Sequence, residues 1–204
     1  LIAIVAPAVA ATFPDTWRNL NGWLLAHGVD AVYDVSFGAE LTVKTYLDHI
    51  QSEKPQTVIA QPCPAIVTYI EVHQPELLPH LSPADSPVLH LIKMIRAYTP
   101  EYANHRVVFI SPCVAKKREF EATGCGALNV TFNALLAHFQ KNEVRLESYP
   151  QSDFSNPPAE RAAAFSTPGG LLETAKRWDP SISGRARKVE GPHMVYDYLR
   201  GLPA

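Results

Sequence analysis

The chain has 204 residues, of which 47% are hydrophobic and 19% are charged, and its formal net charge is −2 at pH 7. This composition excludes a disordered or collagen-like chain, and the length allows one large or two small domains with a buried core. The balanced charge gives no positive field that would attract nucleic acid. The longest apolar run, at the amino terminus, is interrupted by Pro7 and is too short to span a membrane. We therefore expect no nucleic-acid partner and no membrane insertion.

The three cysteines are too few and too scattered for a disulfide framework, which favours a reducing compartment and reactive or metal-binding thiols. The amino-terminal run lacks the basic region of a signal peptide. We therefore expect a soluble, cytoplasmic protein. The chain begins with Leu1 inside a predicted strand, so we also expect it to be a piece of a longer protein.

Short β-branched runs alternate with helical patterns along the chain, which is typical of parallel sheets with crossover helices. Before residue 100, the pattern predicts strands at 2–5, 31–35 and 57–60, with helices at 17–25, 41–50, 66–72 and 87–98. The last of these helices should begin at Ser86-Pro87 and end before Pro100.

After residue 100, the pattern predicts strands at 107–110, 128–131 and 162–165, a charged segment at 116–121 and helices at 134–139 and 171–177. The proline-rich stretch 147–158 is predicted to be a surface loop. We predict an α/β fold of two lobes, 1–100 and 101–204, with mainly parallel sheets, crossover helices and a cleft between the lobes. The second lobe is expected to be incomplete at its carboxyl end.

Several predicted strands end in similar residues: Ala6-Pro7, Pro62-Cys63-Pro64, Pro112-Cys113 and Pro168-Gly169-Gly170. Ligands bind outside the carboxyl ends of the strands in open parallel sheets, so Cys63 and Cys113 are predicted to face one site. A cysteine at a helix N-terminus favours the thiolate that iron–sulfur clusters require. The alternative is that both cysteines are small buried hydrophobic residues.

The polar residues near these strand ends allow two interpretations. Lys116 follows Cys113 closely and either begins a solvated helix or points its ammonium into the site. Gly169-Gly170 resembles a place where backbone amides meet an anion, while Gly38 is interpreted as a turn residue and Glu40 as an acid in the first turn of a helix. The eight histidines show no paired zinc spacing and are interpreted as surface or capping residues. Cys125, between glycines, is interpreted as incidental.

Six motifs occur in order along nearly the whole chain: APAV (6–9), SFGAELT (36–42), PCP (62–64), PELLP (75–79), SPCVAKK (111–117) with Glu119, and TPGG (167–170). Together they resemble the C-terminal domain found in the large chain of iron-only ([FeFe]) hydrogenases. In that family two α/β lobes enclose the H-cluster, a [4Fe–4S] cubane joined through a cysteine to a two-iron centre with carbonyl and cyanide ligands.

The resemblance implies a role for each matching residue. Cys63 and Cys113 match the first two of four cubane cysteines, and Lys116 matches the lysine that donates a hydrogen bond to a cyanide. Glu119 matches a glutamate that orients this lysine. The remaining matches are cofactor-binding or pocket-lining positions, namely Ala6, Pro7, Phe165, Thr167 and Gly169.

The chain also departs from the family pattern. Pro62 occupies the position of the cysteine that donates protons to the open iron, and Ser111 replaces a methionine. The two glutamates of the family's proton path fall near Tyr46 and His49, and only Ser82 matches a path residue. No cysteine follows Cys125, so the chain contains half of the expected cubane ligands and is expected to lack the cluster unless a longer parent supplies the rest.

Three functions remain open. The first is an H-cluster protein of divergent, sensory type that turns over or detects hydrogen, working with ferredoxin-like domains, electron carriers or signalling domains. The second is an iron–sulfur assembly or regulatory protein of the same superfamily with a plain cubane. The third is an α/β interaction module whose cysteines are structural.

Overall fold

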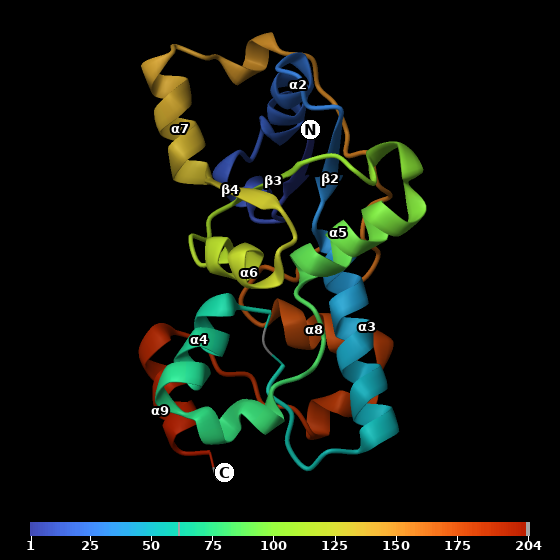
Figure 1. Ribbon diagram of the computed structural model, residues 1–204, viewed down its shortest axis with the longest axis vertical. Coiled ribbons are helices and arrows are strands. Elements are labelled where there is room, and N and C mark those ends of the chain that lie inside the picture. Colours follow the sequence, from blue (N-terminus) through green and yellow to red (C-terminus); the bar gives the residue numbers. More distant parts are fainter. Residues whose placement is uncertain (61, 203–204) are drawn as a thin grey trace.

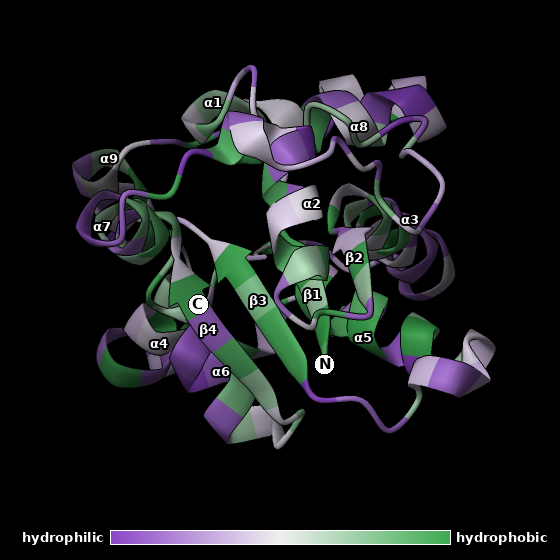
Figure 2. Ribbon diagram, turned by 90° about the horizontal axis from the view of Figure 1, so that it is seen from above, coloured by the Kyte–Doolittle hydropathy of each residue, from purple (hydrophilic) through white to green (hydrophobic). Residues whose placement is uncertain are grey.

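Four short strands form one parallel sheet at the centre of the fold. The computed structural model describes residues 1–60 and 62–202, and it orders the strands β2 (Ala31–Asp34), β1 (Ile2–Val5), β3 (Val107–Ser111) and β4 (Ala127–Thr131). All three strand pairs are parallel. The central strands β1 and β3 are rich in β-branched residues and buried throughout, as expected for strands covered on both faces. Figure 2 shows both as continuously hydrophobic ribbons.

The helices divide between the two ends of the long axis. In Figure 1 the sheet lies in the upper half with α2 and α7, whereas α4, α8 and α9 lie in the lower half. The α-helices are α1 (Val9–Thr12), α2 (Trp17–Ala26), α3 (Ser36–Glu53), α4 (Pro64–His73), α5 (Pro87–Tyr98), α6 (Lys116–Thr123), α7 (Phe132–Lys141), α8 (Gly170–Trp178) and α9 (Pro192–Arg200). Short 3-10 helices are η1 (Pro75–His80), η2 (Pro100–Tyr102), η3 (Leu146–Ser148) and η4 (Pro180–Gly184).

The main hydrophobic core surrounds the sheet, and two smaller cores stabilise the lower half. One joins α3, α8 and η4 through Val43, Ala175 and Ile182. The other joins α4, η1 and α9 through Ile70, Leu77 and Leu199. The α/β class and the parallel sheet predicted from the sequence are confirmed.

The helix predicted at 87–98 has the predicted limits. Pro87 occupies the first turn, where a missing backbone donor has no cost, and the Ser86 hydroxyl accepts the Leu89 N–H at 3.5 Å. Five of its side chains are fully apolar and buried, which fixes this helix against α3 and the sheet: Val88, Leu89, Leu91, Ile92 and Ile95.

Two predicted strands are wrong. Segment 57–60 makes only an isolated parallel bridge, between Ile59 and Leu81. Segment 162–165 is a turn, in which the Phe165 N–H donates to the Ala162 carbonyl at 2.9 Å. Its three consecutive alanines have little β propensity. Cys63 therefore follows a loop rather than a strand.

The predicted surface loop 147–158 covers the outer edge of the sheet. Ser155 and the β2 residue Val32 exchange two hydrogen bonds, and the Asn156 side chain bonds both the N–H and the carbonyl of Asp34. These contacts satisfy backbone groups that an edge strand would otherwise expose. The loop therefore has a structural role that its composition did not indicate.

The sheet draws its strands from both sides of residue 100. β1 and β3 are hydrogen-bonded neighbours, with Val5 opposite Ile110, although they belong to different predicted lobes. The division of the chain into domains 1–100 and 101–204 stays a prediction. Among the described residues, no helix combines the length and hydropathy needed to cross a membrane.

Replacing Asp34 with asparagine should stabilise the fold at neutral pH. Burial raises the pKa of the Asp34 carboxyl above its usual range, more strongly than its hydrogen bonds with Ser36 lower it. The ionised form is therefore disfavoured in the folded protein, and stability falls as pH rises through the folded pKa. Asparagine still accepts the Ser36 N–H, which lies 2.9 Å from Oδ1. We expect a thermal midpoint about 2–4 °C higher at pH 7 and no gain well below the ordinary pKa of aspartate. An equal gain at both pH values would contradict this cause.

Candidate functional site

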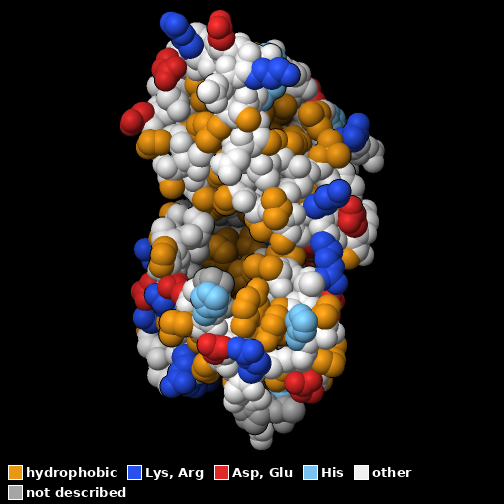
Figure 3. Space-filling view, turned by 90° about the vertical axis from the view of Figure 1, so that its left-hand side faces the viewer, with side chains coloured by type: hydrophobic (Ala, Val, Ile, Leu, Met, Phe, Trp, Pro, Cys, Tyr) orange, Lys and Arg blue, Asp and Glu red, His pale blue; other side chains and the backbone are white. Residues whose placement is uncertain are grey.

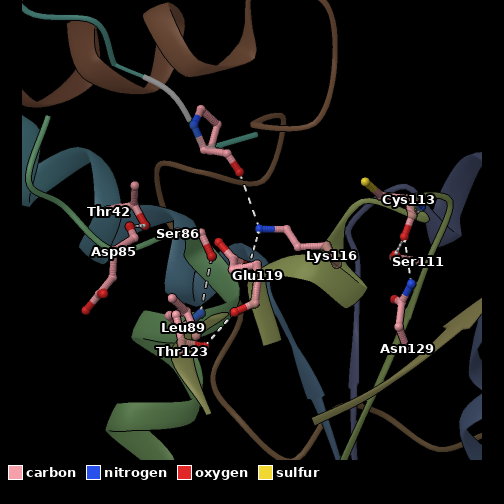
Figure 4. Close-up of polar contacts among 11 residues, drawn as sticks. Thr42, Asp85, Ser86, Leu89, Ser111, Cys113, Lys116, Glu119, Thr123 and Asn129 are labelled. Atoms are coloured by element: carbon pink, nitrogen blue, oxygen red, sulfur yellow. Dashed lines mark hydrogen bonds and ion pairs between the residues drawn. The ribbon is translucent and has the colours of Figure 1, made fainter. Parts of the chain in front are cut away.

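Lys116 links the two segments that carry the candidate metal ligands. It is the first residue of α6, and its Nζ lies 2.8 Å from Glu119 Oε2 and 3.3 Å from the carbonyl oxygen of Pro62 (Figure 4). Its side chain is only 8% exposed and that of Glu119 is 14% exposed. A lysine is buried only when it is paired, and here Glu119 supplies the charge while Pro62 supplies a second acceptor. Of the two interpretations that the sequence left open for Lys116, the solvated helix start is therefore wrong.

One of the two segments that Lys116 links is the turn that holds Cys113. The Cys113 N–H donates to the Ser111 hydroxyl at 3.1 Å, and its carbonyl accepts the Asn129 side-chain amide at 2.9 Å. Figure 4 shows the Cys113 sulfur directed away from Asn129. The thiol is half-buried and free. Its backbone is thus fixed while its sulfur remains available.

Cys63 is the N-cap residue of α4. Its carbonyl accepts the N–H groups of Ile66 and Val67 at 3.1 and 3.3 Å, and Pro64 occupies the first helical turn. The thiol is half-buried and free. Because Lys116 binds the carbonyl of the preceding residue, Pro62, the α6 start and the α4 start meet at this point. The site is therefore assembled from a strand end and a helix start.

Ala6 and Pro7 lie beside the Cys113 turn. The Ala6 N–H donates to the Ile110 carbonyl at 2.9 Å, which places Ala6 level with Ser111 at the carboxyl edge of the sheet. Figure 3 shows a hollow with hydrophobic walls on this molecule, between the sheet-bearing half and the other half. The convergence predicted for the strand ends is confirmed for β1 and β3.

The other predicted cofactor-binding residues, Phe165, Thr167 and Gly169, lie on a segment that contacts the α3–α8 core and Glu190. Phe165 packs on the small core of Val43, Ala175 and Ile182, Thr167 is exposed, and the Gly169 N–H donates to the Glu190 carboxylate. Within the described residues, no hydrogen bond joins this segment to Lys116 or Cys113. Their roles at a cofactor stay predictions.

The sequence predicts that the backbone amides of Gly169-Gly170 meet an anion. In the structure the Glu190 carboxylate of the same chain accepts the Gly169 N–H. Besides the Gly169 N–H, Glu190 binds Lys188 at 2.9 Å, and the hydrogen bond from Lys188 holds the pKa of the Glu190 carboxyl below its usual range. Gly169 has a φ of 77°, which a residue with a side chain rarely adopts.

Glu40 also departs from the prediction: it lies beyond the first turn of α3, and its carboxylate accepts the N–H groups of Arg161 and Ala162.

Two titratable residues have buried polar atoms without a hydrogen-bond partner among the described residues. The Tyr46 hydroxyl is buried on α3, and burial, reinforced by the Glu119 carboxylate, raises its pKa well above its usual range. His90 departs from the surface role predicted for histidines, because its Nε2 is buried and burial lowers its pKa.

The described residues do not complete a metal centre. Among them, no group of three or more His, Cys, Asp or Glu residues has the arrangement of a metal site. Cys125 is buried in the main core before β4, at the opposite end of the sheet from Cys113. The thiols of Cys63 and Cys113 suit iron, but a cubane requires more thiolates than the described residues bring together.

Comparison with known proteins identifies the family. The family model for the C-terminal domain of the iron-only hydrogenase large subunit matches residues 1–198. The chain belongs to this family. As a member of the iron-only hydrogenase family it is divergent: it is 26% identical to iron hydrogenase 1 of Clostridium pasteurianum over 99% of the chain and 40% of that protein. It is also 26% identical to the periplasmic [Fe] hydrogenase large subunit of Nitratidesulfovibrio vulgaris over 87% of the chain and 49% of that protein.

The fold agrees with solved hydrogenase structures. An apo [FeFe]-hydrogenase of Chlamydomonas reinhardtii superposes with a TM-score of 0.66 and 26% identity, covering 86% of this chain and 52% of that one. This chain thus spans about half or less of the hydrogenases it matches. The nuclear prelamin A recognition factor of Mus musculus is 29% identical over 62% of the chain and 31% of its own length. Relatives of the family therefore carry names both of hydrogenases and of a recognition factor.

The sequence predicts Cys63, Cys113, Lys116 and Glu119 for the site, and that prediction did not include Asn129. A polar residue in the middle of the strand Ala-Leu-Asn-Val-Thr is the one signal that pointed to it. The amide reaches the Cys113 carbonyl only because β3 and β4 are neighbours, which the local sequence does not state.

Proposed function

We propose that this chain is part of the H-cluster domain of an [FeFe]-hydrogenase-like protein and contributes Cys63 and Cys113 as thiolate ligands to iron. The observation that carries the proposal is the buried Lys116, which joins the start of α6 to the backbone beside Cys63. This contact brings together the two cysteine-bearing segments that the family motifs connect. A cubane would need further thiolate ligands besides these two.

The H-cluster, when bound, supplies the redox chemistry of hydrogen. Cys63 and Cys113 would hold it through their thiols, and the Lys116 ammonium would donate to its anionic ligands. Glu119 binds that ammonium at 2.8 Å. Because two thiols form half of a cubane site, no catalytic step follows from these residues alone.

Pro62 favours slow hydrogen turnover or hydrogen sensing over fast catalysis. Reversible hydrogen chemistry needs a proton donor within hydrogen-bond reach, and proline has no acidic proton. Its carbonyl is already occupied by Lys116. Ferredoxin-like domains or other electron carriers, or signalling domains, are the partners that such a protein would use.

A second candidate function is an iron–sulfur regulatory protein with a plain cubane. The similarity to a protein named a nuclear prelamin A recognition factor supports the part of this proposal that has the protein act through a partner. Both candidates use Cys63 and Cys113 as ligands. They differ in the two-iron centre, whose carbonyl and cyanide ligands absorb in the infrared.

The test is the metal content of the natural full-length protein, matured with its cluster under anaerobic conditions. Cys63→Ala and Cys113→Ala should each lower iron and acid-labile sulfide per chain by more than half, because each removes a thiolate ligand. Cys125→Ala is the matched control and should retain both, because Cys125 is buried in the core away from the site.

The same samples separate the candidates. Carbonyl and cyanide bands support the hydrogenase-like function, and iron without those bands supports the plain cubane. Hydrogen uptake as fast as that of ordinary hydrogenases would contradict the slow turnover expected from Pro62. Unchanged iron content in both cysteine variants would reject both candidates in favour of an interaction module.

A further inference from the structure

Asn129 makes an unusual contact for a strand residue. Its Nδ2 donates to the Cys113 carbonyl at 2.9 Å, across the pair formed by β3 and β4. A carbonyl only accepts, so the amide must present its nitrogen to Cys113 and its oxygen to the other side. That oxygen, Oδ1, is buried without a partner among the described residues.

Among the described residues, Asn129 gains a hydrogen bond on one side and leaves a buried acceptor unpaired on the other. A buried acceptor without a donor costs about 1–3 kcal/mol, whereas the hydrogen bond to Cys113 contributes about 1 kcal/mol. A valine at this position would suit the strand and have no unpaired side-chain atom, but it would leave the Cys113 carbonyl with only the Ser111 hydroxyl, 3.5 Å away. A residue that costs stability in this way is expected where a backbone position must be held for function.

The contact completes a set of hydrogen bonds that fixes both backbone polar groups of Cys113. Ser111, which is 1% exposed, accepts the Cys113 N–H, and Asn129 binds the carbonyl. Figure 4 shows both contacts on the side opposite the sulfur. At Cys63, by contrast, the carbonyl is bound by the N–H groups of Ile66 and Val67 in its own helix.

We propose that Asn129 is a positioning residue that holds the Cys113 backbone so that its thiol faces the site. Its importance for iron rests on the proposed function, but the hydrogen bond acts on the thiol whether or not iron is bound. Iron content therefore tests the proposed function, and thiol reactivity tests this inference.

The experiment measures the alkylation rates of Cys113 and Cys63 by iodoacetamide in the same metal-free protein, resolved by mass spectrometry. In Asn129→Val the Cys113 turn loses an anchor, so the ratio of the Cys113 rate to the Cys63 rate should rise about fivefold. General destabilisation would raise both rates and leave the ratio unchanged. Asn133→Val, an exposed asparagine early in α7, is the matched control and should keep the wild-type ratio.

Asn129→Asp adds a pH profile that a purely structural role would not show. Its carboxyl group donates a hydrogen bond only when protonated. Burial beside the Cys113 carbonyl, which only accepts, would raise the pKa of this carboxyl above the ordinary value of aspartate. The ratio should therefore be raised at about pH 8 and fall toward the wild-type value as the pH is lowered to about 5, whereas Asn129→Val keeps a raised ratio at both. A ratio in Asn129→Val that matches wild type would overturn the proposal, as would a raised ratio in Asn129→Asp that does not change with pH.

Discussion

Replacing Lys116 with methionine should lower the free energy of unfolding by about 3 kcal/mol, measured by urea denaturation. Methionine fills a similar volume but has no charge and no donor. It leaves the Glu119 carboxylate, which is 14% exposed, without the ammonium that lies 2.8 Å away. It also removes the contact between α6 and the Pro62 carbonyl. Breaking a buried pair by removing one partner is more costly than removing both.

Two further variants identify the cause. Lys117→Met makes the same chemical change one residue along, where the side chain is 76% exposed and lies 3.9 Å from Glu121, so its effect should stay below about 0.5 kcal/mol. The double variant Lys116→Met with Glu119→Gln should recover part of the loss, because no unpaired carboxylate remains. If Lys116→Met and Lys117→Met lose the same stability, the buried pair is not important for the fold.

The second large effect is expected for Gly38→Ala, which should destabilise the protein by about 3 kcal/mol, at the upper end for overpacking. A Cβ at Gly38 would lie 2.0 Å from the Pro87 carbonyl oxygen and 3.1 Å from the Leu91 Cβ. The obstructing atoms belong largely to the backbone at the start of α5, so a side-chain movement cannot relieve the clash. α3 and α5 would have to separate, and the start of α5 would lose its packing.

Gly184→Ala is the control for this prediction, because a Cβ there meets no atom within 4 Å among the described residues. Its free energy of unfolding should match wild type within about 0.5 kcal/mol. Equal stability of Gly38→Ala and Gly184→Ala would show that α3 and α5 do not pack this closely. Gly38 is thus required by helix packing, and the turn role predicted for it is wrong.

The local patterns of the chain were sufficient for most of the fold. β-branched runs located all four strands of the sheet, and Ser86-Pro87 marked the start of α5. The predicted strands at 57–60 and 162–165 did not form: Ile59 makes an isolated bridge with Leu81, and 162–165 forms a turn. Whether a short apolar run joins a sheet depends on long-range pairing as well as on its own residues.

The sequence was enough to propose which residues belong to the candidate site, but it did not predict which of them contact one another. The order of the motifs identified Cys63, Cys113, Lys116 and Glu119, and spacing along α6 places Glu119 one turn after Lys116. The contact of Lys116 with Pro62 spans 54 residues, and that of Asn129 with Cys113 crosses two strands. Hydrogen bonds of this kind depend on which surfaces meet, so no local pattern encodes them.

The order of motifs and the alternation of strands and helices by themselves determined the family, the α/β class and which thiols are candidates for iron. Only the tertiary structure decided that Lys116 is buried and paired, that Glu190 occupies the amide of Gly169, and that Asn129 holds the Cys113 turn. The physical reason is that residue type and spacing determine hydrogen-bonding capacity and local conformation. The partner that satisfies a buried charge or amide is selected only when distant segments pack and exclude water.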